Sequence, residues 1–273
     1  MMTKKETLAA LALVAISLAG TTPAWAAMSH VMTGGTAIFT DDFTSPYTNN
    51  WIPWDSTSTS NAAFTQDMTG GGSVTATRSG DRYNYAEFCS KTSINVSRTT
   101  EFVMSENSPT TYLSNQTLFV NGQGPWGTKG LCVTHDMYNG DGKGEIALYL
   151  YSDSPGVPSA LLYNSGSMGS YQYEYSFSLM VNSTTGYWAF YWAAGTGGVT
   201  SGNLAGSGYL TPAQITTYLP GPLYTGAGVY SGSTTSTVTN TIYGVDIYQN
   251  VPEPAVLSRL GLGAGLLLFR HRA

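Results

Sequence analysis

The chain has 273 residues and a formal net charge of −5, and only 10% of its residues are charged. It contains 32 glycines and 19 tyrosines. Low charge with many aromatic side chains argues against a disordered chain and favours short strands joined by polar turns. The basic residues between residues 28 and 250 form no run: Arg78, Arg82, Lys91, Arg98, Lys129 and Lys143. Binding to nucleic acid is not expected, because phosphate neutralisation requires clustered Lys and Arg.

The N-terminus has the three-part order of a secretory signal peptide. Two lysines precede an apolar run at residues 8–20, and Ala24 and Ala26 flank Trp25 in the small–x–small pattern that signal peptidase requires. The apolar run is too short to span a bilayer comfortably. We therefore expect residues 1–26 to be removed by signal peptidase, with cleavage after Ala26 or one residue later. A buried N-terminal helix is the alternative.

Residues 28–250 predict one β domain, of a usual size for a single sandwich. Runs of β-branched and aromatic residues between polar turns predict strands at residues 37–42, 73–77, 85–88, 93–96, 101–104, 116–120, 226–230 and 242–248. Two hairpins are also expected, because turn-forming Asn, Asp and Gly separate further pairs of such runs. Their strands cover residues 130–137 with 145–151, and residues 171–179 with 187–193.

The run from Tyr171 to Leu179 alternates strictly between apolar or aromatic and polar residues. This pattern predicts a strand with one buried face and one solvent-exposed face. A single short helix is expected at residues 211–218, because Thr211 is a favoured N-cap and Pro212 a favoured first helical residue. Together, about ten short antiparallel strands predict an all-β, two-sheet sandwich of the jelly-roll type.

The start of this domain resembles the first strand of concanavalin A-like (laminin G-like) jelly rolls. The residues that carry this resemblance are the run from Ile38 to Phe43 (IFTDDF), followed by Trp51. The predicted turn at residues 183–186, then residues 228–230 and 242–248, follow the order of that fold's later strands. The resemblance covers most of the domain and implies a lectin-like sandwich, a fold that also hosts many glucanases.

The glucanases of that fold carry two Glu and one Asp in a Glu-x-Asp-x-x-Glu run or a close variant, which places nucleophile and acid on one strand face. This chain has no such run, since Glu101 and Glu106 have no Asp between them, while Glu145 precedes Ile-Ala-Leu and Glu174 lies among tyrosines. The domain also has only two histidines and no G-x-S-x-G elbow. We expect no catalytic residues; a divergent glycoside hydrolase or lyase is the alternative.

The densest group of oxygen ligands is Asp136, Asn139 and Asp141, at the tip of the first hairpin. Calcium takes about six to eight oxygen ligands from such loops, so a Ca²⁺ site is one interpretation. The loop does not fit an EF-hand, because Met137 stands where the first Asp belongs. The alternative is a solvated hairpin tip in which Asp and Asn serve turn geometry.

Aromatic residues provide the other candidate binding signal. The run at 187–192 places three large aromatic side chains on one face, a pattern that is more often core packing than a sugar-binding platform. Trp51, Trp54 and Trp126 lie beside Pro or Gly in predicted loops. They are the candidate exposed residues for binding polysaccharide, with loop anchoring as the alternative.

The chain has two cysteines, Cys89 and Cys132. In an exported chain, a disulfide is the simpler interpretation. It would stabilise the domain by about 4 kcal/mol in the chain-entropy model. Two separately buried thiols are the alternative.

The C-terminus resembles the PEP-CTERM sorting signal of Gram-negative bacteria. The motif Pro252, Glu253 and Pro254 is followed by an apolar stretch, which ends before Arg270 and Arg272. The resemblance covers about the last two dozen residues, and a basic end that stays inside the membrane agrees with it.

This resemblance implies that an exosortase recognises and processes residues 251–273 during export to the surface or exopolysaccharide matrix. Arg259 interrupts the apolar stretch, although a side chain at that depth can reach the interface. An amphipathic C-terminal helix is the alternative. The expected organisation is therefore a signal peptide, a β-sandwich at 28–250 and a sorting and membrane segment. The expected protein is an exported surface or matrix protein of a Gram-negative bacterium that binds polysaccharide; a purely structural envelope protein is the further alternative.

Overall fold

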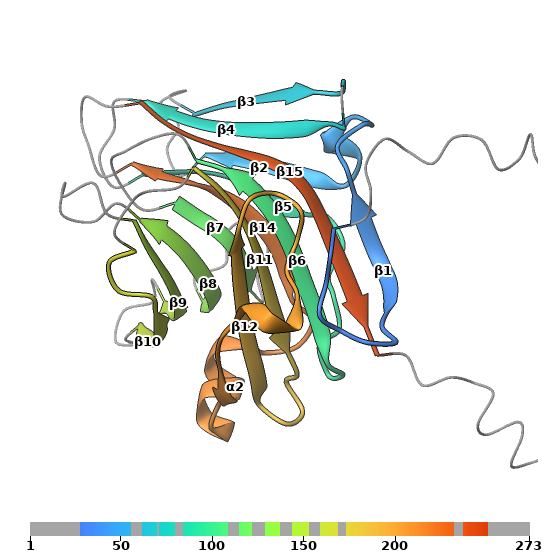
Figure 1. Cartoon of the computed structure of the whole chain (residues 1–273), viewed down its shortest axis with the longest axis vertical. Helices are drawn as coiled ribbons and strands as arrows, with labels where there is room; N and C mark the ends of the chain where they lie inside the picture. The colour runs from blue at the N-terminus through green and yellow to red at the C-terminus, as the bar shows by residue number, and fades with distance from the viewer. Residues whose placement is uncertain are drawn as a thin grey trace, which may run out of the picture.

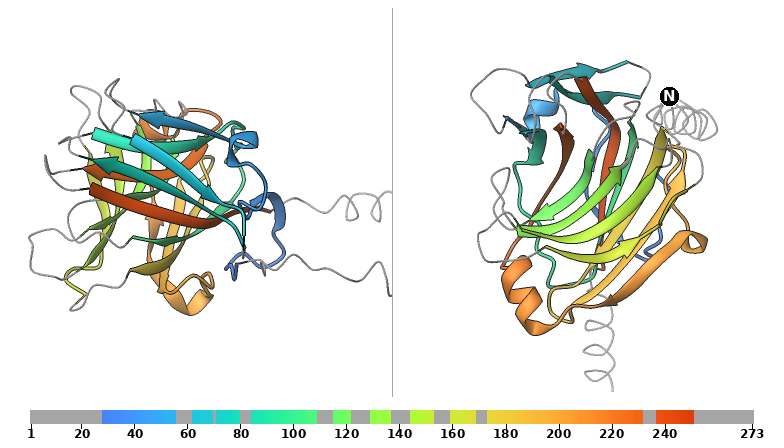
Figure 2. Two further views of the ribbon diagram at one scale, coloured as in Figure 1. Left: turned by 90° about the horizontal axis from the view of Figure 1, so that it is seen from above. Right: turned by 90° about the vertical axis from the view of Figure 1, so that its left-hand side faces the viewer.

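The computed structural model describes residues 28–55, 62–69, 71–79, 84–108, 115–121, 129–136, 144–152, 159–168, 173–231 and 237–250. These residues form two antiparallel sheets that pack face to face as two layers (Figure 1, Figure 2). The predicted β-sandwich is therefore confirmed. The predicted signal peptide, with Ala24 and Ala26, and the predicted sorting segment at 251–273 lie outside the described residues.

One layer is an eight-stranded sheet. Its strands are β1 (Thr36–Asp41), β3 (Ala62–Asp67), β4 (Ser73–Ser79), β6 (Thr100–Asn107), β11 (Glu174–Val181), β12 (Tyr187–Ala194), β13 (Leu204–Tyr209) and β15 (Thr237–Gln249). Their spatial order is β13-β12-β11-β6-β15-β4-β3, and β1 pairs with β15 beside this path.

The other layer is a seven-stranded sheet. Its strands are β2 (Trp51–Asp55), β5 (Asn84–Ser90), β7 (Asn115–Asn121), β8 (Lys129–Asp136), β9 (Glu145–Ser152), β10 (Ala160–Asn164) and β14 (Tyr224–Ser231). Their spatial order is β10-β9-β8-β7-β14-β5-β2. Two 3-10 turns, η1 (Tyr47–Asn49) and η3 (Ser201–Asn203), and one helix, α2 (Pro212–Tyr218), complete the described elements.

The hydrophobic core lies between the two sheets. Strands β6 and β11 direct Phe102 and Phe177 into it, and β8 contributes Leu131 from the opposite sheet. Trp188 and Phe190 of β12 are buried in the same cluster, and Trp192 packs against it. The prediction that this aromatic row belongs to the core is therefore confirmed, because its ring face is already covered.

Helix α2 begins and ends as its sequence predicts. The Thr211 side chain accepts a hydrogen bond from the Gln214 N–H, and the Gln214 side chain returns to the Thr211 backbone. This reciprocal pair is a capping box, which satisfies two backbone donors at the start of the helix. Pro212 occupies the first turn, where its missing N–H carries no cost.

The outer face of the eight-stranded sheet differs from the prediction. Ser176 and Ser178, on the polar face of β11, are fully buried. Residues 28–35, which we call the N-terminal segment, lie over this face, with Met28 and Met32 in an apolar cluster that includes Met180. The prediction that this face is exposed to solvent was wrong. Strict alternation shows which residues share a face of a strand, but it does not show what covers that face.

The predicted disulfide is also wrong, because Cys89 and Cys132 are both buried thiols that do not form a disulfide. Register explains why: Cys89 is opposite Gly226, Gly226 is opposite Phe119, and Phe119 is opposite Cys132. The cysteines thus share one row of the seven-stranded sheet but are separated by three strand spacings, about 14 Å. A disulfide requires Cα atoms less than about 7 Å apart.

We expect both thiols of the folded protein to resist a thiol reagent and to react fully once the chain is unfolded. Burial, and secondarily the charge of Glu87, raise the pKa of Cys89 far above its usual range, so the reactive thiolate is scarce. Thiol titration at pH 8, with and without denaturant, measures this. Fast reaction of either cysteine in the native protein would contradict the burial of both side chains.

Candidate functional site

Trp51 is not the exposed aromatic that the sequence suggested. It begins strand β2, is fully buried, and packs edge-on against Phe88 at a ring-centroid distance of 5.2 Å. Its Nε1 donates a hydrogen bond of 2.8 Å to Asp41 Oδ2. Trp51 therefore belongs to the core, and the prediction that it binds polysaccharide was wrong because a buried ring cannot stack on a sugar.

Trp54, three residues later, lies on the other face of β2. It is half-buried, and its Cα partner across the strand pair is Glu87 of β5. Trp54 therefore remains a candidate contact residue, although it lies in a strand rather than in a loop. Trp126 lies outside the described residues.

The predicted calcium ligands are only partly within the described chain. Asp136 ends strand β8, and its backbone is paired with that of Glu145 in β9. Asn139 and Asp141 lie outside the described residues. Within the described ranges, no group of three or more His, Cys, Asp or Glu side chains is placed to hold a metal ion. The calcium site stays a prediction.

A buried polar network that the sequence did not indicate lies between the two sheets. Glu106 of β6 contacts His135 of β8 (Oε1 to Nδ1, 3.1 Å) and accepts a hydrogen bond of 2.7 Å from Asn240 of β15. All three side chains are fully buried, and the His135 ring packs edge-on against Tyr175. Because solvent does not reach this network, it ties the sheets together rather than forming an open reaction centre.

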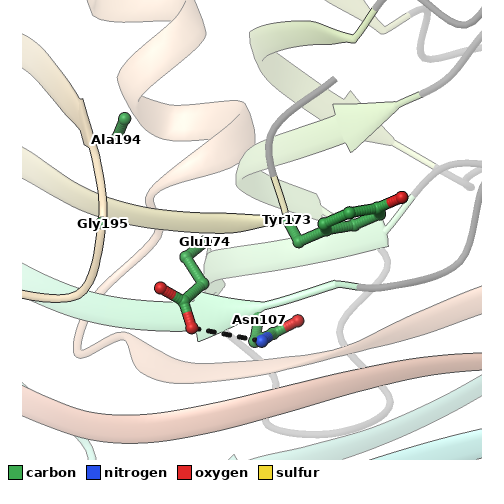
Figure 3. Close-up of a pocket in the computed structure, with 5 residues that line it drawn as sticks. All are labelled: Asn107, Tyr173, Glu174, Ala194 and Gly195. Carbon is green, nitrogen blue, oxygen red and sulfur yellow. Dashed lines mark hydrogen bonds between the residues drawn. The ribbon is translucent and has the colours of Figure 1, made fainter. Parts of the chain in front are cut away.

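An open pocket occurs at one end of the eight-stranded sheet, where β6 ends, β11 begins and β12 ends. We call it the rim pocket; it has a volume of about 460 Å³ and is lined by Asn107, Tyr173, Glu174, Ala194 and Gly195. Figure 3 shows the Asn107 and Glu174 side chains meeting from neighbouring strands, with the Tyr173 ring beside them. The volume falls within the range of about 300–1,000 Å³ that is usual for small-molecule sites.

Strand register brings the polar side chains of the rim pocket together. Asn107 and Glu174 are direct Cα partners, and Asn107 Nδ2 donates a hydrogen bond of 3.3 Å to Glu174 Oε1. Two backbone hydrogen bonds hold the same corner, from Ser108 N to Tyr173 O and from Gly195 N to Glu174 O, each 2.8 Å long. The pocket therefore has a fixed backbone frame.

The rim pocket also keeps groups available for a ligand. The Tyr173 side chain is 48% exposed, and the Oδ1 atom of Asn107 is buried without accepting a hydrogen bond from the described chain. Gly195 faces open space, since an added Cβ would have no neighbour within 4 Å. A flat ring beside an amide and a carboxylate can stack on one face of a sugar ring and bind its hydroxyl groups.

Comparison with solved structures identifies the architecture. The chain is similar to LamAcat from Zobellia galactanivorans (TM-score 0.51, 12% identity, covering 78% of this chain and 98% of that one). It is also similar to the legume lectin-like domain from Entamoeba histolytica (TM-score 0.51, 9% identity, covering 75% and 92%). The domain is a lectin-like jelly roll.

A third similar structure is the CBM2 module of the evolved Dit of Lactobacillus casei BL23 phage J-1. Its TM-score is 0.54, at 11% identity, and the match covers 80% of this chain and 98% of that one. No protein-family model and no curated protein matches the sequence. At this level of identity the likenesses show the jelly-roll fold alone, so the function must be argued from the site.

The rim pocket was missed in the sequence for an identifiable reason. Glu174 lies among tyrosines in the sequence and Asn107 precedes it by 67 residues, so no local motif joins the two. Only the pairing of β6 with β11 places the two opposite each other.

Proposed function

We propose that this protein is an exported, non-enzymatic polysaccharide-binding protein that binds sugar in the rim pocket. The observation that carries the proposal is the half-exposed Tyr173 ring beside the Asn107–Glu174 pair, in a pocket of ligand size. Aromatic stacking supplies affinity, and the amide and carboxylate select hydroxyl positions. The lectin-like fold is consistent with this role but does not establish it.

The roles of other carboxylates support a binding protein over an enzyme. Asp41 accepts a hydrogen bond from buried Trp51, and Glu106 bonds to Asn240 between the sheets, so these groups serve the fold. The described lining of the rim pocket contributes one carboxylate, Glu174. Glycoside hydrolysis ordinarily requires two carboxylates flanking the scissile bond.

The proposed location rests on the two ends of the sequence. Signal peptidase would remove the N-terminal signal, and an exosortase would process the PEP-CTERM-like segment, with Pro252, Glu253 and Pro254 as its motif. The protein would then act in the periplasm, on the outer surface or in the extracellular matrix of a Gram-negative bacterium. Among the described residues, no helix is both long and apolar enough to cross a membrane.

We expect Tyr173→Ala to weaken polysaccharide binding about tenfold or more, because a lost stacking contact of roughly 1.4 kcal/mol corresponds to that factor. The exported protein is screened on a glycan array that includes the host's exopolysaccharide, and affinities are measured by calorimetry. Tyr209→Ala is the matched control, since Tyr209 is 73% exposed on edge strand β13 and does not line the pocket.

Glu174→Gln tests the hydroxyl contacts, because it removes the charge but keeps a hydrogen-bonding group. Repeating the array with Ca²⁺ and with a chelator tests the predicted loop site separately. Equal affinities for Tyr173→Ala and Tyr209→Ala would refute the rim pocket as the binding site. Release of shorter sugars from a bound glycan would instead favour the divergent carbohydrate-active enzyme.

A further inference from the structure

Two buried carboxylates hold the N-terminal segment on the eight-stranded sheet. Glu101, which is fully buried, accepts hydrogen bonds from the backbone N–H of Val31 (2.8 Å) and of Met32 (2.7 Å), one on each oxygen. Ser178 donates a third hydrogen bond of 2.7 Å to the same carboxylate. The backbone of the segment thus satisfies a charge that would otherwise be costly to bury.

The second carboxylate is that of Asp246 in β15, which lies beside Met28, the first residue of the N-terminal segment. It is 5% exposed, and its Oδ2 accepts hydrogen bonds from Met28 N at 3.3 Å and from the Tyr248 hydroxyl at 3.4 Å. In the uncut chain both donors are neutral. Burial raises the pKa of Asp246 above its usual value, although the hydrogen bonds from Met28 N and the Tyr248 hydroxyl, and then the charge of His30, partly oppose this effect. The charge of Asp42 adds a smaller increase. A buried carboxylate of this kind is stabilised most by a positive charge.

The segment is also seated by a close backbone contact. Ser29 N donates to Gly197 O (3.1 Å), and Val199 N donates to Ser29 O (2.8 Å). Gly198 has a φ of +88°, and a Cβ placed there would lie 2.3 Å from Ser29 N and O. The loop before η3 therefore requires glycine at this position to accept the segment, and the position of Met28 N beside Asp246 is well defined.

Met28 directly follows the second of the two predicted cleavage positions, the one after Ala27. Hydrolysis after Ala27 breaks the bond to Met28 N, and water supplies the hydroxyl of the new carboxyl group and a hydrogen to the new amine. This amine takes up a further proton at neutral pH. Cleavage after Ala26 would instead leave the Met28 nitrogen in a peptide bond to Ala27, as it is in the uncut chain.

We propose that the α-ammonium group created by signal-peptide cleavage binds the Asp246 carboxylate and locks the N-terminal segment onto the sheet. Export processing would then complete the fold of the domain, because the uncut chain offers only an amide at this place. The proposal shares only the export step with the proposed function. None of its readouts depends on sugar binding, so the two can fail independently.

The decisive experiment combines three chain starts with one substitution. Three chains are made: one begins at Met28, one at Ala27, and the extended chain at Pro23, which adds four neutral residues before Ala27. Each is released from a fusion by a protease that leaves no added residue. Each is made with Asp246 and with Asp246→Asn, and thermal unfolding is measured at pH 7. N-terminal sequencing of the exported protein identifies which start is natural.

We expect opposite effects in the natural and the extended chains. In the natural chain, Asp246→Asn leaves the ammonium group without its partner and lowers the melting temperature by about 5 °C or more. In the extended chain, the same substitution removes an uncompensated buried charge and leaves the melting temperature unchanged or higher. Gly198→Ala displaces the N-terminal segment. In its presence, Asp246→Asn should change the melting temperature equally in the natural and the extended chains.

The stability that this pair adds to the folded chain depends on pH through the titration of the α-amine. Pairing raises its pKa above the unfolded value of about 7.7–8.0, so the added stability is complete below that range and is lost as pH rises through the folded pKa. His30, Tyr248 and Asp42 also act on Asp246, and Glu101 acts in turn on His30 and Tyr248. Because these groups are present in both chain starts, the difference between the chains reports the amine.

Acylation of the α-amine provides a second readout that does not depend on stability. In the folded natural chain, the amine should react with an acylating reagent far more slowly than in Asp246→Asn. Equal effects of Asp246→Asn in the natural and extended chains would overturn the proposal. An unprotected amine would do the same, as would an exported protein whose first residue is not Met28.

Discussion

Replacing Trp51 by alanine is expected to lower the free energy of unfolding by about 4 kcal/mol. The substitution empties the centre of an aromatic cluster, in which Phe39, Phe43 and Phe88 surround the ring at centroid distances of 5.6, 5.9 and 5.2 Å. It also removes the Nε1 donor from Asp41, which is 8% exposed. Asp41 keeps the Asn50 side chain as a donor, so the cavity is the larger cost.

Urea unfolding followed by circular dichroism measures this change without relying on tryptophan fluorescence. Trp54→Ala is the matched control, because it removes the same side chain from the same strand at a half-buried position. We expect it to cost roughly 1–2 kcal/mol. Similar losses for the two variants would contradict the assignment of Trp51 to the core.

The second large effect is expected at Glu106. Glu106→Ala should lower the free energy of unfolding by about 3–5 kcal/mol, because it removes one partner of a buried polar network. His135 and Asn240 would lose their contacts of 3.1 and 2.7 Å with the carboxylate while both stay fully buried. Chemical denaturation at pH 7 checks the value.

Two further variants separate the network from simple loss of packing. Glu106→Gln keeps the side-chain volume and an acceptor for Asn240, so its cost should be clearly smaller than that of the alanine variant. Glu174→Ala removes an exposed glutamate at the neighbouring end of the sheet and should change stability by less than about 0.5 kcal/mol. A Glu106→Ala variant as stable as Glu174→Ala would disprove the structural role of the network.

Most of the strands could be predicted from sequence, but the four that end the two sheet paths could not. Strands β2, β3, β10 and β13 were not expected, and these four end the strand paths of the two sheets. Strand β1 also pairs on one side only, with β15, but its sequence predicted it. Edge strands are covered on fewer sides, so their residues need not follow an apolar pattern. In β2 the strand contains Pro53, and β13 contains two glycines. The expected strand at 93–96 proved to be one isolated bridge, between Ile94 and Leu223.

The candidate site was harder to predict than the fold, because the exposure of a side chain depends on tertiary packing. Trp51 beside Pro53 has the composition of a loop, yet it lies in the core. Asn107 and Glu174 become neighbours only through the pairing of β6 with β11. By contrast, Thr211 and Pro212 predicted the start of α2 correctly, because a helix cap is determined by adjacent residues.

The place of β15 has a consequence for the order of events in synthesis. This strand is the last described one, yet it lies inside the eight-stranded sheet, paired with β6 on one side and with β4 and β1 on the other (Figure 1). Until residues 237–249 have been synthesised, β1 lacks the strand with which it pairs, and no strand links β4 to β6. Such long-range pairing delays folding. The eight-stranded sheet therefore consists of separate parts until the last described strand is available, and the sandwich closes only when residues 237–249 enter it.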